Sequence, residues 1–192
     1  MIRGVIWPGA AILLSVLSAC AAPRAAGLSP AEPASLAGGL ARDMIDAERA
    51  FETGNKAALA TAVARIDRRN PHPIDDSAGD PVARWREAVP EAIPPVRGRA
   101  LGPGYVRGTL APGGARRMDQ VFLSGQVATV AASARPQKDL RLKIFDGEGK
   151  LVCDRSPAHV RDCSFTPVFT QRYRIEIANG GAATAHYYLV VD

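Results

Sequence analysis

The sequence predicts an α+β protein in which an N-terminal helical hairpin precedes a C-terminal all-β sandwich of jelly-roll type. Apolar residues recur every three or four positions over residues 35–69, which is the period of a helix. From Gly104 onwards they recur at every second position, which is the period of a strand. Short apolar runs separated by turn residues at regular spacing favour a sandwich, and 192 residues suit one such domain with appendages.

The chain opens with MIRGVIWPGAAILLSVLSAC, in which one charge, Arg3, precedes a short apolar run and small residues. This order is typical of a secretory signal. A transmembrane helix needs about 20 predominantly apolar residues. Pro8, Ser15 and Ser18 interrupt the run, so we expect a cleaved signal and not a membrane span.

The end of this segment, Leu17-Ser18-Ala19-Cys20, resembles the lipobox of bacterial lipoproteins. The resemblance implies that residues 1–19 are removed and that Cys20 is acylated as the first residue of the mature chain. Several acyl chains hold a protein stably at a membrane. Ala21 after the cysteine favours the outer over the inner membrane. The alternative is an ordinary signal with an incidental cysteine. Residues 20–34, rich in Ala and Pro, are expected to form a flexible tether.

Residues 35–69 are expected to form the helical hairpin. Gly54 can end the first helix and Asn55 can cap the second. One apolar stripe of the first helix contains Leu36, Leu40, Met44, Ala47 and Phe51. A hairpin that packs on the next domain would bury such a stripe. Residues 70–103 are interpreted as a Pro- and Gly-rich linker with a short helix, in which Trp85 anchors the helix to a core.

The sandwich is expected over residues 104–192. Two short strands are predicted around Gly125 within residues 120–132. The other strands are predicted over 139–145, 150–154, 163–167, 172–179 and 185–192. In the last of them, Tyr187, Leu189 and Val191 share one face. Tyr188, and Phe145 earlier in the sandwich, point outward.

Residues 104–192 resemble the bacterial pre-peptidase C-terminal (PPC) domain. The similarity lies in the order of KDLRLKIFDGEGKLV, SFTP, YRIEIAN and the final Tyr-x-Leu-x-Val. The resemblance implies a small jelly-roll sandwich that serves as an accessory module for secretion, localisation or substrate contact. The family's usual DLDLY is DLRLK here, so Arg141 replaces an acid.

Three cysteines are present. If Cys20 is acylated, Cys153 and Cys163 remain as an even pair in an oxidising compartment, where a disulfide is expected. A metal pair is the alternative, but it lacks nearby His or Cys partners.

No catalytic constellation is visible. His72, His159 and His186 have no His or Cys at metal-ligand spacing, and there is no Gly-x-Ser-x-Gly motif. We therefore expect neither an enzyme nor a cofactor. Asp139, Asp146, Asp154 and Asp162 could meet at one sheet edge to bind calcium, but solvated turn aspartates are the favoured interpretation. A formal net charge of +5 is too small to indicate nucleic-acid binding.

Arg141 and Lys143 alternate outward on one predicted strand, and Arg172 and Arg174 do so on another. If these strands are neighbours, the four residues form a basic strip. A solvated face is the favoured interpretation, and contact with an anionic lipid head group, lipopolysaccharide or wall polymer is the alternative.

The expected function is that of a lipid-anchored envelope protein that faces the periplasm. It would act as a non-enzymatic interaction or structural module, with an envelope protein or anionic polymer as partner. The other class is a glycan- or peptide-binding accessory module beside a separate enzyme.

Overall fold

The computed structural model describes residues 35–75, 79–92, 102–136, 139–158 and 162–192. The predicted signal, the acylation site at Cys20 and the tether lie outside these residues, as does His159. The helices are α1 (Leu36–Glu52), α2 (Lys56–Asp67), α3 (Pro81–Ala88) and the 3₁₀ turn η2 (Pro90–Ala92).

The helical hairpin forms where its capping residues predict it. Ser35 Oγ accepts a hydrogen bond of 2.9 Å from the Gly38 N–H at the start of α1. Asn55 Oδ1 accepts one of 3.0 Å from the Ala58 N–H at the start of α2. Gly54 between the helices has φ +66°, a left-handed conformation that residues with a Cβ rarely adopt. The predicted cap at Asn55 and helix end at Gly54 are confirmed.

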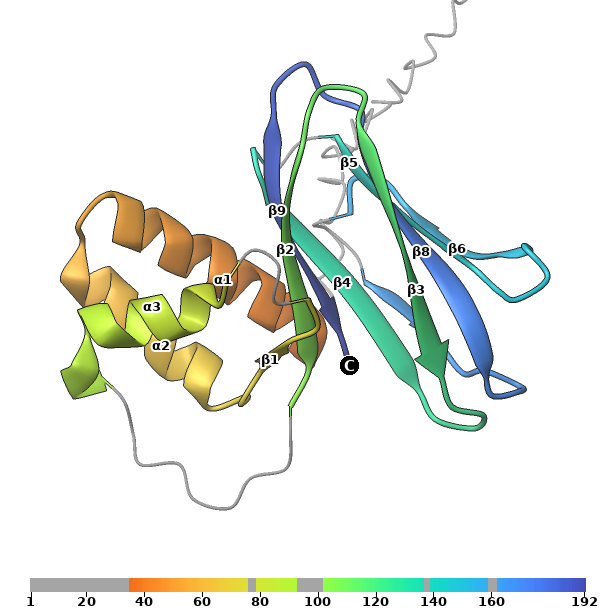
Figure 1. Cartoon of the computed structure of the whole chain (residues 1–192), viewed down its shortest axis with the longest axis horizontal. Helices are drawn as coiled ribbons and strands as arrows, with labels where there is room; N and C mark the ends of the chain where they lie inside the picture. Colours follow the sequence, from red (N-terminus) through yellow and green to blue (C-terminus); the bar gives the residue numbers. More distant parts are fainter. Residues whose placement is uncertain (1–34, 76–78, 93–101, 137–138, 159–161) are drawn as a thin grey trace, which may run out of the picture. The chain divides into compact units, whose positions relative to one another are not determined.

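Nine strands of the described residues form two sheets. Their bounds are β1 (His72–Pro73), β2 (Gly104–Leu110), β3 (Ala115–Phe122), β4 (Ala128–Arg135), β5 (Leu140–Phe145), β6 (Leu151–Arg155), β7 (Cys163–Phe165), β8 (Gln171–Asn179) and β9 (Ala185–Val191). The five-stranded sheet has the order β1-β2-β9-β4-β7, and the four-stranded sheet has the order β3-β8-β5-β6. The two sheets enclose one core, so the predicted α+β class with a C-terminal sandwich is confirmed (Figure 1).

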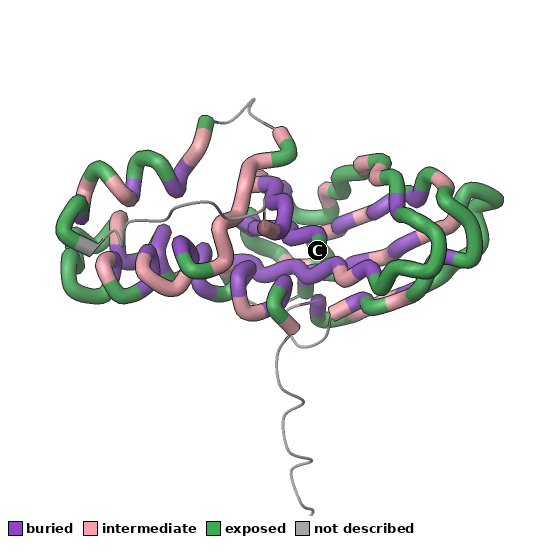
Figure 2. The backbone as a smooth tube through the Cα atoms, turned by 90° about the horizontal axis from the view of Figure 1, so that it is seen from below, coloured by how far each residue is buried: buried purple, intermediate pink, exposed green. Residues whose placement is uncertain are grey.

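A second core lies on the other side of the five-stranded sheet, where α1 packs on β4 and β9. Strand β9 therefore has both faces covered. Tyr187, Leu189 and Val191 point between the sheets, while Tyr188 and Val190 pack under the helices. Figure 2 shows this as continuous burial along the central strands, between the helices and the four-stranded sheet. The helical hairpin packs on the sandwich, as expected.

Two sequence-based expectations need correction here. Leu36 was placed on the buried stripe of α1, but it is 65% exposed. It is the first residue of the helix and has no preceding turn for its side chain to lie over, whereas Ala37 and Leu40 are fully buried. Tyr188 was expected to present an outward ring. It does point out of the sandwich, but its side chain is fully buried because α1 and α3 cover this face, and its ring lies 6.1 Å from that of Trp85. The predicted anchoring role of Trp85 agrees with its complete burial.

The described parts of the segment 70–103 take part in the fold. Strand β1 pairs in parallel with β2, and Asp80 caps α3 by accepting a hydrogen bond from the Val82 N–H. Tyr105 on β2 donates its hydroxyl to the same carboxylate. Burial, followed by this hydrogen bond, raises the pKa of Tyr105 far above its ordinary value. Asp80 therefore joins α3 to the five-stranded sheet.

Ion pairs connect the helices to the sandwich. Glu48 on α1 is almost fully buried and accepts hydrogen bonds from Arg107 on β2, with Nε at 3.0 Å. Glu52 near the end of α1 pairs with Arg135 on β4. Since a buried carboxylate without a cation would be costly, the Glu48 pair constrains how α1 sits on the sheet.

The disulfide Cys153–Cys163 is present, with 5.9 Å between the two Cα atoms. Cys153 lies on β6 of the four-stranded sheet and Cys163 on β7 of the five-stranded sheet. Both half-cystines are buried in the core between the sheets. The bridge therefore joins the two layers of the sandwich.

Candidate interaction surface

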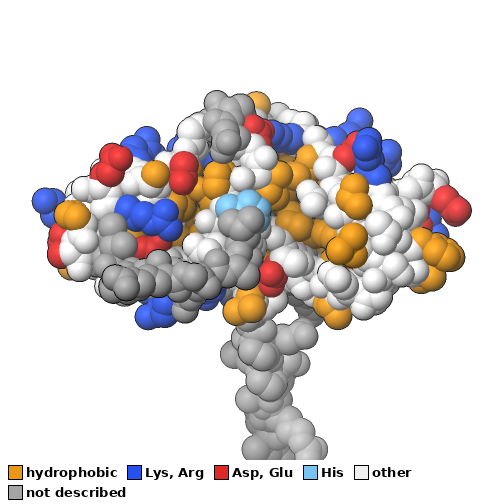
Figure 3. Space-filling view, turned by 60° about the horizontal axis from the view of Figure 1, so that its bottom comes forward, with side chains coloured by type: hydrophobic (Ala, Val, Ile, Leu, Met, Phe, Trp, Pro, Cys, Tyr) orange, Lys and Arg blue, Asp and Glu red, His pale blue; other side chains and the backbone are white. Residues whose placement is uncertain are grey.

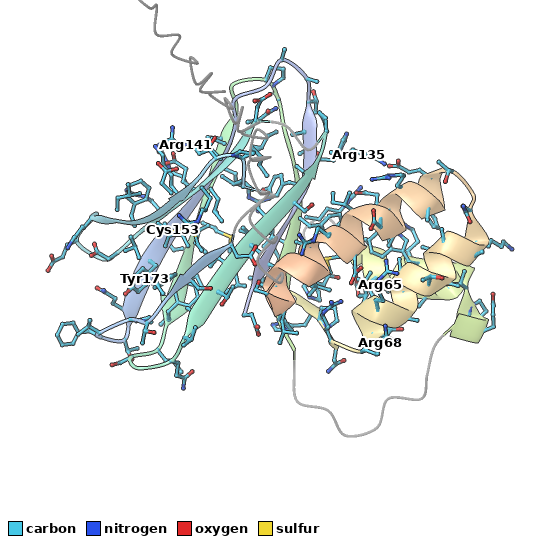
Figure 4. The ribbon with its side chains drawn as sticks, turned by 180° about the vertical axis from the view of Figure 1, so that it is seen from behind. Arg65, Arg68, Arg135, Arg141, Cys153 and Tyr173 are labelled. Carbon is cyan, nitrogen blue, oxygen red and sulfur yellow. A yellow bond between two sulfur atoms is a disulfide. The ribbon has the colours of Figure 1, made fainter. Side chains whose placement is uncertain are left out.

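The outward face of the four-stranded sheet is the face of the sandwich that no described helix covers. Figure 4 shows Arg141 on this face, on the opposite side of the sandwich from the helices. Strands β5 and β8 pair in antiparallel register, with Lys143 opposite Glu176 and Phe145 opposite Arg174. The four residues Arg141, Lys143, Arg172 and Arg174 thus lie on adjacent strands and share one face. We call this set the basic strip.

The strip is interleaved with acidic side chains. Arg141 forms a two-point contact with Asp154 on β6, with its Nε 2.8 Å from Oδ1. Arg172 lies 3.9 Å from Asp119 on β3. Lys143 stands between Glu176 and Asp154 on the neighbouring strands. The strip is therefore part of an ion-paired lattice.

The aromatic ring expected on this face is already in contact with a cation. The guanidinium of Arg174 lies 4.6 Å from the centre of the Phe145 ring. With Tyr188 buried under the helices, neither of the two outward rings predicted from the sequence remains free for a sugar to stack on. This face of the sandwich therefore does not favour stacking of a sugar ring.

Only the end of β3, the third strand of the surface, was predicted from the sequence, from Gln120 onwards, so Arg117 and Asp119 were missed. Arg117 on β3 pairs with Glu176 at 2.7 Å, and Arg117, Asp119 and Val121 alternate with the inward Met118 and Phe122. This alternation is visible in ARRMDQVF and could have predicted the strand. With Arg117 included, basic side chains outnumber acidic ones on the face. The basic residues are Arg117, Arg141, Lys143, Arg172 and Arg174, and the acidic residues are Asp119, Asp154 and Glu176.

The ion pairs shift the titration of both carboxylates. The hydrogen bonds from Arg141 lower the pKa of Asp154 below its usual value of 3.8. The hydrogen bond from Arg117 lowers the pKa of Glu176 below its usual value of 4.5. The same contact with Asp154 raises the pKa of Arg141. Asp154, Glu176 and Arg141 are therefore held in their charged forms at neutral pH.

The four aspartates considered for calcium do not meet at one edge. Asp146 accepts hydrogen bonds from the backbone of its own turn, Asp154 pairs with Arg141, and Asp162 accepts the Ser35 hydroxyl. Asp139 lies beside Gly180, at the end of β8 far from Asp146. In the part of the chain that the structure describes, no three His, Cys, Asp or Glu side chains could hold a metal ion together.

Two surface recesses lie beside the helices. An open groove of about 540 Å³ lies between α1 and α2, and a smaller one of about 180 Å³ lies beside Asp80 and Arg107. Neither is lined by a histidine or a cysteine. His186 is exposed and lies 3.2 Å from the Thr109 hydroxyl, while His72 lies on β1.

None of the described helices has the length and apolar character needed to cross a bilayer.

A scan against models of known protein families finds no match, and a search of curated proteins finds none. Among solved structures, the chain is similar to a periplasmic inhibitor of g-type lysozyme from Aeromonas hydrophila. The two share 13% sequence identity with a TM-score of 0.39, and the similarity covers 47% of this chain and 84% of the inhibitor. It is also similar to the pre-peptidase C-terminal domain of a collagenase from Bacillus anthracis, at 10% identity and a TM-score of 0.41, over 46% and 87% of the two chains. The family expected from the sequence is thus among these structures. Similarity at this level assigns neither ligand nor activity to this chain.

Proposed function

We propose that this chain is a lipid-anchored protein of the bacterial cell envelope and that its sandwich is a non-enzymatic interaction module. The anchor is an acylated Cys20, and the outer membrane is favoured over the inner one by Ala21. The module faces the periplasm and contacts an anionic envelope surface. The observation that carries this proposal is the uncovered face of the four-stranded sheet, where the basic strip lies on two adjacent strands.

The charge lattice explains what kind of ligand this surface suits. Each carboxylate in the lattice already has an Arg or Lys beside it, so an added cation would find no free acid among them. The basic residues in excess keep some of their attraction for anions. Because Arg172 is largely exposed, its attraction is screened by salt within about 10 Å at 0.1 M ionic strength. Contact with a phosphate- or sulfate-bearing polymer should therefore be weak and sensitive to salt.

The binding test uses the full chain in detergent micelles and immobilised heparin as the polyanionic probe. Binding should weaken steadily between about 50 and 500 mM salt. A variant with Arg141, Lys143, Arg172 and Arg174 all replaced by Gln should lose the salt-sensitive part of the binding.

The matched control replaces four exposed basic residues of the helices, Arg42, Arg49, Lys56 and Arg84, by Gln, which changes the net charge equally. The control should bind as the original chain does. Equal losses in both variants would show that net charge and not the strip determines binding. In that case the strip would be only a solvated face.

The anchor is tested separately. A labelled fatty acid should be incorporated into the original chain in a bacterial host, and Cys20→Ser should abolish the label and leave the chain unprocessed or released from membranes. An unlabelled original chain would contradict the proposed anchor and would leave the binding test of the strip unaffected.

A further inference from the structure

Four exposed apolar side chains gather at one end of the sandwich. Leu123 and Val127 lie in the loop that connects β3 of the four-stranded sheet to β4 of the five-stranded sheet, and Val168 and Phe169 lie in the loop that connects β7 to β8. Their exposed fractions are 51%, 69%, 74% and 71%, in that order. We call this set the apolar tip. Singly exposed apolar residues are common on protein surfaces, but a cluster of them marks a contact site.

Hydrogen bonds join the two loops of the tip into one unit. Ser124 Oγ donates to the Val168 carbonyl at 2.7 Å, and the Ser124 N–H donates to Thr170 Oγ1 at 3.0 Å. The Gly125 N–H donates to the Pro167 carbonyl at 2.9 Å. Below the loops, Phe122, Phe165 and Tyr173 pack together with ring centres 5.1 to 5.5 Å apart. The exposed side chains are therefore held outward by an ordered base.

The tip carries no charge of its own. Residues 120–134 and 163–171 contain no Asp, Glu, Lys or Arg. In Figure 3, where the lower end of Figure 1 is turned forward, hydrophobic side chains on the sandwich half are set among uncharged atoms. Charges begin at the margin of the tip. Arg172 lies opposite Val121, and Asp192 pairs through its backbone with Thr129. Such a surface can enter an apolar phase to a shallow depth without desolvating an ion.

The tip lies close to the point where the described chain begins. Ser35 donates its hydroxyl to Asp162, and only six residues of chain lead from Asp162 to Val168. Six residues span at most about 20 Å, and residues 20–34 reach at most about 50 Å beyond Ser35 when fully extended. A chain held at a membrane by Cys20 can therefore bring its tip to the same leaflet.

We infer that the apolar tip inserts into the lipid leaflet that carries the anchor, so that the sandwich docks on the membrane by this end. The inference depends on the proposed anchor in one respect only, which is that the anchor keeps the sandwich close to the lipid. The convex, uncharged tip suits a fluid acyl phase, and the mixed charges at its margin suit the head-group layer. Insertion driven by apolar area differs from contact through the basic strip in being insensitive to salt.

The test places a tryptophan in the tip of the full, acylated chain, reconstituted in phosphatidylethanolamine–phosphatidylglycerol vesicles that contain brominated lipids. The emission of Phe169→Trp should shift to the blue and be quenched by the brominated chains, and it should remain so at 1 M salt. Trp85 is fully buried and supplies a constant background, and Trp7 of the predicted signal is replaced by Phe in every variant. Ala182→Trp is the matched control, because this exposed residue lies in the turn after β8, at the opposite end of the strand. Its emission should not be quenched.

Adding Leu123→Ser or Val168→Ser to Phe169→Trp should lower the equilibrium constant for insertion by about fivefold each. Replacing the basic strip by Gln should leave the quenching unchanged, and acylation is read from the fatty-acid label on the same sample. An unquenched tip in labelled, vesicle-bound protein would overturn the inference while the anchor stands. Chain without the fatty-acid label can also be mixed with the vesicles. If the emission of Phe169→Trp is quenched in that sample, the result would support insertion of the tip and reject the anchor. The blue shift could instead depend on protein concentration in detergent and occur without quenching by the brominated lipids. That result would overturn lipid insertion and show that the tip contacts a second copy of the chain.

Discussion

Side chains on the same face of one strand can differ sharply in exposure in this protein. His186 and Tyr188 lie two residues apart on β9 and point to the same side of the five-stranded sheet. His186 is exposed, whereas Tyr188 is fully buried under the helices. Burial raises the pKa of Tyr188 far above its ordinary value. The difference between the two residues comes from the position of the helices.

We expect Tyr188→Ala to lower the free energy of unfolding by about 3–5 kcal/mol, because it removes a large side chain from the core between helices and sheet. His186→Ala, on the same face of the same strand, should change the stability by no more than about 0.5 kcal/mol. Both are measured by urea denaturation with circular dichroism. A similar small loss in the two variants would mean that the helices do not cover β9 in solution.

The pair of Arg141 and Asp154 gives a pH dependence of known sign. Because Arg141 lowers the pKa of Asp154 in the folded chain, the pair stabilises the fold above the ordinary carboxyl pKa of 3.8. This stabilisation is lost as the pH falls through the lower, folded-state value. Asp154→Asn should therefore be less stable than the original chain at pH 7, and the difference should vanish well below pH 3.8. A difference that is equal at pH 7 and pH 2 would contradict this assignment.

Helices and strands form here because local signals agree with the contacts that they make. Asn55 caps α2 directly after Gly54 has ended α1, and the resulting hairpin turns the two helices side by side. The predicted fold of residues 35–69 needed only these caps and the three-to-four spacing of apolar residues. Strands β2 and β3 were harder to foresee individually, because Arg107, Arg116 and Arg117 interrupt their apolar pattern. Arg107 is on a covered face because Glu48 neutralises it there.

Asn55→Ala should lower the free energy of unfolding by about 1 kcal/mol, since the Ala58 N–H loses its side-chain acceptor. Lys56→Ala alters the next, exposed residue and keeps the cap, so it should have little effect. The comparison is made by chemical denaturation of both variants. Equal stability of Asn55→Ala and the original chain would show that the cap is not formed.

The molecule as a whole is held together across its layers by a few long-range links. The disulfide joins the two sheets, and the Glu48–Arg107 and Glu52–Arg135 pairs join α1 to the five-stranded sheet. No helix of the described residues covers the outer face of the four-stranded sheet. This arrangement is why the basic strip and the apolar tip are available as surfaces, whereas the outer face of β4 and β9 is not.

Removing the disulfide by the double substitution Cys153→Ala and Cys163→Ala should cost about 3 kcal/mol of stability, from the loop of ten residues that it closes. A reducing agent should destabilise the original chain by a similar amount and leave the double variant unchanged. If the reducing agent has no effect on the original chain, the two thiols are not linked in the purified protein.

Local residue patterns were enough to predict the order of helices and sandwich, the alternation of Arg141 and Lys143, and the pairing of Cys153 with Cys163. Each of these depends on spacing along the chain or on the number of cysteines. Which strands are neighbours depends on contacts between distant residues, so the joining of β5 to β8, which assembles the basic strip, became known only from the folded chain. The same is true of the burial of Tyr188 and of the hydrogen bond from Ser124 to the Val168 carbonyl, which joins the two loops of the apolar tip. A period of two assigns a side chain to one face of a strand, but it does not indicate whether a helix, another loop or solvent meets that face.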